Sequence, residues 1–222
     1  MVFLATHFGK HAKDGWRLAR DVYGRLGGPG LWDWAHIGAD PAGFRPWLAA
    51  NEAILRGGGG VSRRFSNHRK YESLKASSNN GTAAVFETYV AWVGPPRTHQ
   101  DLVRDTHRRI GQNPRDVFDH LYRGMDCVQR FGRLAKFDYL TMLGKLGTAP
   151  IVPGSAYLGE ATGPLAGARL LFEGTTDSNQ NGRTLDRYLI ELDECLGVGM
   201  QALEDALCNW QKSPHSFISF RG

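Results

Sequence analysis

Apolar residues recur at helical spacing along most of the 222-residue chain, and each run ends at glycine or proline. Leu185, Leu189, Leu192 and Leu196 form one such stripe, and Gly197 separates it from the next helix. A stripe of this period buries one side of a helix, whereas a strand would alternate with period two. The pattern predicts an all-α protein with a single helical domain that could have two lobes.

Start and stop signals place the individual helices. Asp40 is expected to cap a helix that begins at Pro41, and Asn113 one that begins at Pro114. Residues 81–93 could form a helix or a short strand, and we favour helix because the surrounding signals are helical. Helices are also predicted over residues 16–26, 101–110, 134–146, 185–196 and 200–212, with a glycine-rich turn into a helix at 159–172.

Four consecutive glycines at residues 57–60 resist regular structure. They mark a hinge or a place where the backbone can approach a ligand closely. We therefore divide the chain into an amino-terminal helical segment, residues 1–60, and a helical domain with the candidate catalytic residues, residues 61–222. The second part is expected to be one compact unit.

Composition excludes several classes of protein. Hydrophobic residues make up 41% of the chain and charged residues 22%, as in ordinary globular proteins. The three cysteines and eight histidines show no metal-ligand spacing, so we expect no structural metal, no cofactor and a reducing compartment. The apolar runs are too short for a signal peptide or a membrane span, which predicts a soluble protein with no membrane partner.

Basic residues bunch at residues 63–70, 104–109 and 130–136, within a net charge of +5. Such clusters can follow a phosphate backbone, or they can be ordinary solvated faces. Phe65 lies within the first cluster and Tyr71 directly follows it. Arginine forks bind phosphate and aromatic rings stack on bases, so this segment is a candidate nucleic-acid contact. A flexible basic surface loop is the alternative.

The last predicted helix places an acid, a thiol and a base on one surface. Its apolar stripe consists of Met200, Leu203, Leu207 and Trp210. The opposite face carries Gln201, Asp205, Cys208 and Lys212, with Glu204 and Asn209 at its edges. Side chains one turn apart are neighbours, so this face is a possible site. The alternative is a solvated face in which Cys208 only packs.

Asp138 lies inside the predicted helix 134–146, between Phe137 and Tyr139. This helix is apolar on most sides and is therefore expected to be central. A buried carboxylate has to be paired, hydrogen-bonded or protonated. Asp138 is either a structural salt-bridge or capping residue, or an acid that acts on a substrate amine.

Four segments carry a family resemblance. They are residues 64–72 (RFSNHRKYE), 131–146 (FGRLAKFDYLTMLGKL), 163–172 (GPLAGARLLF) and 204–212 (EDALCNWQK). In this order they resemble the amino acid:DNA transferase family of bacteriophages, which is associated with the α-glutamyl/putrescinyl-thymine pyrophosphorylases. The resemblance implies an all-helical fold distantly related to the helix-hairpin-helix DNA glycosylases. The segment 154–172 departs from the glycosylase hairpin pattern.

The implied activity is thymine hypermodification in phage DNA, in the cytoplasm of the infected bacterium. The implied partners are double-stranded DNA with 5-hydroxymethyluracil that has been (pyro)phosphorylated, and a small amine or an amino acid such as glycine. The amine would displace the phosphate leaving group at the exocyclic methylene.

This chemistry assigns roles to particular side chains. Asp138 or Asp205 would take the proton of the amine, and Lys212 would bind an amino acid's carboxylate. Tyr71 or Trp210 would receive a base that leaves the stack. Cations at the leaving group would come from Arg64, His68, Arg69, Arg130 and Arg133, and Glu72 and Asn209 complete the predicted substrate-binding set.

Two other classes of function stay open on the sequence alone. A helix-hairpin-helix glycosylase or lyase would remove the base, with Asp177 or Asp186 as its catalytic acid. A non-catalytic DNA-binding protein would instead have Asp138 and Asp205 bound to structural partners. An enzyme is expected to gather its predicted cations and acids in one pocket, and a binding protein to disperse them.

Overall fold

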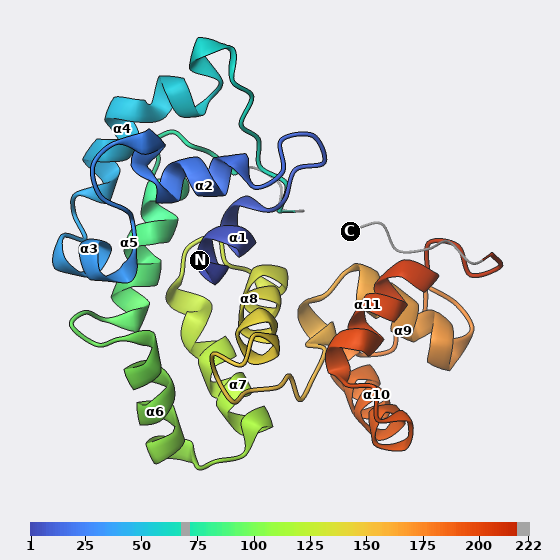
Figure 1. Cartoon of the computed structure of the whole chain (residues 1–222). Coiled ribbons are helices and arrows are strands. Elements are labelled where there is room, and N and C mark those ends of the chain that lie inside the picture. The colour runs from blue at the N-terminus through green and yellow to red at the C-terminus, as the bar shows by residue number, and fades with distance from the viewer. Residues whose placement is uncertain (68–71, 217–222) are drawn as a thin grey trace. The chain divides into compact units, whose positions relative to one another are not determined.

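The computed structural model describes residues 1–67 and 72–216, and Figure 1 shows its course from blue to red. Within these residues the chain forms eleven α-helices and no strand, which confirms the all-α prediction. The helices belong to two compact units, each described here by itself. Unit 1 comprises residues 1–111 and 120–149, and unit 2 comprises residues 112–119 and 150–222. The predicted border at residue 60 falls inside unit 1.

Unit 1 contains α1 (Val2–Phe8), α2 (Arg17–Tyr23), α3 (Trp34–Ala39), α4 (Phe44–Leu55), α5 (Thr82–Val93), α6 (His99–Ile110) and α8 (Arg133–Lys145). Unit 2 contains α9 (Gly163–Glu173), α10 (Gly182–Leu196) and α11 (Met200–Trp210). Between them α7 (Pro114–Gly124) begins in unit 2 and ends in unit 1. Short 3-10 turns lie at Arg25–Gly27, Gly58–Gly60, Met125–Cys127 and Leu158–Glu160.

Aromatic rings from well-separated helices form the core of unit 1. Phe44 of α4 stacks on Phe86 of α5 with ring centroids 3.9 Å apart. Phe3 of α1 stacks on Tyr89 of α5 at 3.7 Å and meets Phe131, which precedes α8, at 5.3 Å. Stacked rings bury large apolar areas in defined orientations. These contacts join α1, α4, α5 and α8 in one core.

Local sequence explains where several helices begin and end. The side chain of Asn113 accepts a hydrogen bond from the backbone N–H of Arg115 (3.0 Å), so the predicted cap of α7 is confirmed. Thr98 and Asp101 form a reciprocal capping box at the start of α6. At the end of α5, Gly94 adopts the left-handed conformation that closes a helix, with φ of 77°.

The start of the first basic segment is fixed against α1 and α2. The N–H of Ser66 donates to the carbonyl of Phe8 (2.7 Å), and the guanidinium of Arg63 lies 2.7 Å from Asp21. Gly9 follows α1 with φ of 72°, and a Cβ at this position would lie 2.1 Å from the carbonyl oxygen of Ser66. Only glycine permits this backbone contact, which fixes Ser66 beside the end of α1.

Close backbone approach also organises unit 2. A Cβ on Gly167 of α9 would lie 2.3 Å from the carbonyl oxygen of Leu207 in α11. The two helices therefore pack through glycine, and Leu185, Leu189 and Leu207 complete an apolar cluster around them. Such a contact tolerates no side chain on α9 at this point.

Several details of the sequence prediction are corrected. Helix α4 begins at Phe44 rather than at Pro41, because Asp40 accepts from the N–H of Gly43 (3.0 Å) and forms a turn first. Trp210 and Leu196, predicted in apolar stripes, are 39% and 56% exposed. Glu204, predicted at the edge of a polar face, is buried. The sequence analysis did not identify α1 or α3, which have seven and six residues.

Candidate functional site

Three of the predicted substrate-binding residues line one cavity in unit 1. Glu72, Arg130 and Arg133 surround a space of about 620 Å³ next to the start of α8. We call it the arginine cavity. Its wall is completed by Asp126, Val128, Gln129, Phe131, Gly132, Leu134 and Ala135. Arg130 and Arg133 both come from the segment at the start of α8, and Glu72 comes from a distant one. Whether the predicted cations and acids form one functional site stays a prediction. His68, Arg69 and Tyr71 lie outside the described residues.

Charged side chains of both signs line the arginine cavity: Arg130 and Arg133 are cations, and Glu72 and Asp126 are anions. Arg133 is only 9% exposed, and its guanidinium lies 4.8 Å from the centre of the Phe137 ring. Asp126 is balanced by Lys136, whose Nζ lies 2.5 Å from its carboxylate. Gly132 precedes α8 without a side-chain cap, so the first backbone N–H groups of this helix add a positive partial charge. The two arginines and the start of α8 are the part of this cavity that suits an anion.

The other predicted residues of unit 1 lie elsewhere. Arg64 is exposed and lies 3.8 Å from Asp14, which joins it to the loop before α2. Asp138 is exposed on α8, so the argument from its burial is wrong. Successive helical residues turn by about 100°, so an exposed position can follow the buried Phe137 directly. Arg104 and Arg108 pair with Asp101 and Asp105 on α6, as expected for a solvated face.

The predicted residues of the last helix all lie in unit 2. Asp205 accepts a hydrogen bond from the side chain of Gln201 (3.0 Å), and both are half-buried. Asn209 is half-buried near the end of α11, and Lys212 is exposed in the turn that follows it. Cys208 packs toward α9, with its sulfur 3.1 Å from where a Cβ on Gly163 would lie. Whether these residues meet those of the arginine cavity stays a prediction.

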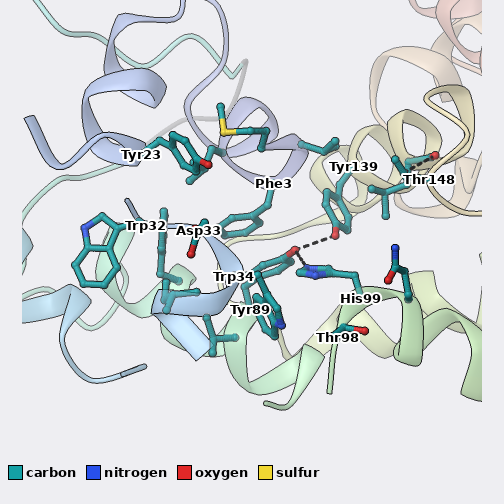
Figure 2. A pocket seen from close by; sticks show the side chains of 18 of the residues that line it. Phe3, Tyr23, Trp32, Asp33, Trp34, Tyr89, Thr98, His99, Tyr139 and Thr148 are labelled. Atoms are coloured by element: carbon teal, nitrogen blue, oxygen red, sulfur yellow. Dashed lines mark hydrogen bonds between the residues drawn. The ribbon is translucent and has the colours of Figure 1, made fainter. Parts of the chain in front are cut away.

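A second cavity in unit 1 was missed by the sequence analysis. It measures about 490 Å³ and is lined by aromatic side chains from α1, α3, α5, α6 and α8. We call it the aromatic cavity. Figure 2 shows the hydroxyl of Tyr89 between His99 and Tyr139, with Phe3 and Trp34 beside them. Its rings are those of Phe3, Tyr23, Trp32, Trp34, Phe86, Tyr89, His99 and Tyr139.

A chain of hydrogen bonds runs along one wall of the aromatic cavity. The Tyr89 hydroxyl lies 2.5 Å from Nε2 of His99 and 2.9 Å from the Tyr139 hydroxyl. Burial lowers the pKa of His99 from 6.5 to about 4, and the amino group of Met1 adds to the decrease. Burial raises the pKa of the Tyr89 and Tyr139 hydroxyls above 10. All three groups are therefore uncharged at neutral pH.

The low pKa of His99 predicts a loss of stability in acid. Above pH 6.5 the imidazole is neutral in the folded and unfolded states alike and contributes no pH dependence. Between pH 6.5 and 4 the unfolded state binds a proton that the folded state does not, so unfolding becomes easier by about 2 kcal/mol for a partly exposed ring. NMR titration of the His99 Cε1 proton should give a midpoint near 4.

Urea unfolding at pH 7 and at pH 4.5 measures the same effect as a free energy. His99→Gln should lose less stability than the wild type between these two pH values. An imidazole midpoint near 6.5, or an equal loss in both proteins, would contradict the neutral, buried state of this ring.

The structure also bears on metals and membranes. In the described ranges, no group of three His, Cys, Asp or Glu side chains could hold a metal ion. Likewise, no helix among these residues has the length and apolar character needed to cross a membrane.

Comparison with known proteins identifies one family. The family described as alpha-glutamyl/putrescinyl thymine pyrophosphorylase, clade 3, matches residues 1–222. No curated protein and no solved structure matches the chain. The match covers both units and confirms the resemblance found in the sequence. The chain therefore belongs to clade 3 of the alpha-glutamyl/putrescinyl thymine pyrophosphorylases, a family of enzymes that act on thymine.

Proposed function

We propose that this protein transfers an amine or an amino acid onto (pyro)phosphorylated 5-hydroxymethyluracil in double-stranded phage DNA. The observation that carries the proposal is the arginine cavity, where Arg130, Arg133 and the start of α8 meet. A pyrophosphate leaving group accumulates negative charge as its bond breaks. Fixed cations and helix N–H groups stabilise that charge most in the transition state.

The bond changes of this step balance without an external reductant or oxidant. The amine nitrogen forms a bond to the exocyclic methylene carbon, and the carbon–oxygen bond to pyrophosphate breaks. The bonding electrons leave with pyrophosphate, and the nitrogen loses a proton to a carboxylate. The protein has to hold the leaving group, orient the amine and accept this proton.

Glu72 is our choice for the proton acceptor, because its carboxylate shares the arginine cavity with both guanidinium groups. There it would also attract the protonated amine before the reaction. Asp138 and Asp205 are the alternatives proposed from the sequence, with Lys212 as the partner of an amino acid's carboxylate. Comparing Glu72→Gln with Asp138→Asn and Asp205→Asn distinguishes the three acids.

We assign DNA contact to the basic segment that begins at Arg64. The side chain of this arginine is 57% exposed to solvent. Asn209 and Lys212 are the proposed contacts from α11 and the turn after it. Arginine and lysine bind phosphates without regard to sequence, so DNA affinity should fall steeply as salt increases. This property alone would not separate an enzyme from a DNA-binding protein.

The decisive experiment supplies DNA with (pyro)phosphorylated 5-hydroxymethyluracil and single amines or amino acids. Mass analysis of the nucleosides should show a new species that carries the amine, with release of pyrophosphate or phosphate. Release of the intact base with an abasic site would instead show a glycosylase. DNA binding without any new nucleoside would overturn the proposal in favour of a binding protein.

A further inference from the structure

Two neighbouring cavities of opposite character lie in unit 1. The arginine cavity carries guanidinium groups, whereas the lining of the aromatic cavity contains no arginine or lysine. Phe3 lines the aromatic cavity and Phe131 the arginine cavity, and these two rings stack with centroids 5.3 Å apart. A ligand with an apolar ring and a charged substituent would need two such places close together.

Resting on the proposed function, we propose that the aromatic cavity receives the uncharged pyrimidine ring of the modified thymine after it leaves the DNA stack. Its volume of about 490 Å³ lies in the range of ligand pockets. Enzymes that act on a base within duplex DNA extrude it, and they hold it by stacking and by hydrogen bonds to its edge. The aromatic cavity provides both kinds of contact.

The stacking surface comes from Trp34, which α3 presents to the cavity, whereas the ring of Phe3 is already stacked on Tyr89. Trp34 is half-buried and meets His99 edge to face, with ring centroids 4.5 Å apart. The contact with His99 fixes the orientation of the Trp34 ring. Because this ring is only half-buried, a planar ligand can still stack on it. This favours a planar ligand.

Hydrogen bonding comes from His99, whose Nε2 is bound to Tyr89. The other ring nitrogen, Nδ1, has no hydrogen-bond partner among the residues that the structure describes. A neutral imidazole can present this nitrogen as a donor or as an acceptor, according to its tautomer. The edge of a uracil ring offers two carbonyl acceptors and one N–H donor, so either tautomer finds a match.

The charges of the aromatic cavity argue against the other two parts of the reaction. Phosphate would find no arginine or lysine in this lining, only the partly buried amino group of Met1, whose pKa is lowered by burial. A protonated amine would find only Asp33, which already accepts bonds from the backbone and the ring of His36 at 2.9 and 2.7 Å. The uncharged ring is therefore the part that fits.

The test measures ring binding separately from transfer. The probe is 5-hydroxymethyl-2′-deoxyuridine, which carries neither phosphate nor amine. Saturation-transfer NMR should show contact with its base protons, and inorganic pyrophosphate should not displace it. Trp34→Leu and His99→Gln should each weaken the binding of this nucleoside by about tenfold, the usual effect of losing one base-stacking or base-edge contact.

Trp16→Leu is the matched control, because this tryptophan is 47% exposed and lines neither cavity. It should change nucleoside binding less than about twofold, and circular dichroism should show all three variants folded. Equal affinity of the wild type and both cavity variants, or an equal loss in Trp16→Leu, would overturn the assignment. Ring binding without transfer by the wild type would overturn the proposed function alone.

Discussion

Replacing Arg133 with methionine is expected to lower kcat by about 10²- to 10³-fold, the effect of removing one group that stabilises developing negative charge. The guanidinium lies in the arginine cavity and is 9% exposed, so water cannot substitute for it fully. KM for the modified DNA should change much less, because the interaction strengthens as the leaving group departs. Single-turnover measurement of nucleoside formation checks this.

Three companion variants distinguish this prediction from an effect on folding. Arg130→Met removes an exposed guanidinium from the same cavity and should lower kcat in the same direction. Arg108→Met removes an arginine of α6 that is 71% exposed, and it should leave kcat unchanged. Arg133→Lys keeps the charge without the fork and should recover part of the rate. A higher KM with unchanged kcat would mean that these arginines bind the ground state and the transition state equally.

Gly9→Ala is expected to destabilise unit 1 by about 3 kcal/mol, through backbone strain and a steric clash together. Gly9 has φ of 72° and ψ of 169°, a region that is almost restricted to glycine. The new methyl group would also start 2.1 Å from the carbonyl oxygen of Ser66. Chemical denaturation gives the free energy, and hydrogen exchange of the Ser66 amide reports the local contact.

Gly15→Ala is the matched control for this variant. Gly15 also has a positive φ, 59°, but a Cβ there would meet nothing within 4 Å. Its alanine variant should lose only the strain, about 1 kcal/mol, and the Ser66 amide should stay protected. An equal loss in both variants would show that the contact between Gly9 and Ser66 contributes no stability. DNA affinity should fall only in Gly9→Ala, because Ser66 fixes the start of the basic segment.

The helices of this protein were predictable where an apolar stripe and a boundary signal coincide. Asn113-Pro114 identifies the start of α7, and Gly132 the start of α8, because both signals depend on a few neighbouring residues. Helices α1 and α3 have fewer than two full turns, and a stripe of that length cannot be distinguished from a loop. Trp210 fits its stripe by spacing, but packing leaves it at the end of α11, 39% exposed.

The two cavities differ in how far sequence could reveal them. Arg130 and Arg133 are noticeable in the sequence because they lie at the start of an apolar helix. Cations in such a position indicate an ion-pair partner or a ligand. Trp34, Tyr89 and His99 look like ordinary core residues, each in its own segment. Periodicity in the sequence can indicate that such residues are buried. It cannot indicate whether their rings fill the space between the helices or enclose a cavity. That depends on how α3, α5 and α6 pack.

Residues 112–119 belong to unit 2, while the chain on both sides of them belongs to unit 1, so neither unit is one continuous stretch. A fragment of residues 150–222 would lack Arg115, the ion-pair partner of the buried Asp193, and Asp119, which accepts from Tyr157. A fragment that ends at residue 149 would keep Arg115 and Asp119 without Asp193 and Tyr157. No single cut therefore yields two intact halves. During synthesis, the first turns of α7 leave the ribosome before residues 150–222. Unit 2 can therefore assemble only after the last third of the chain has been made.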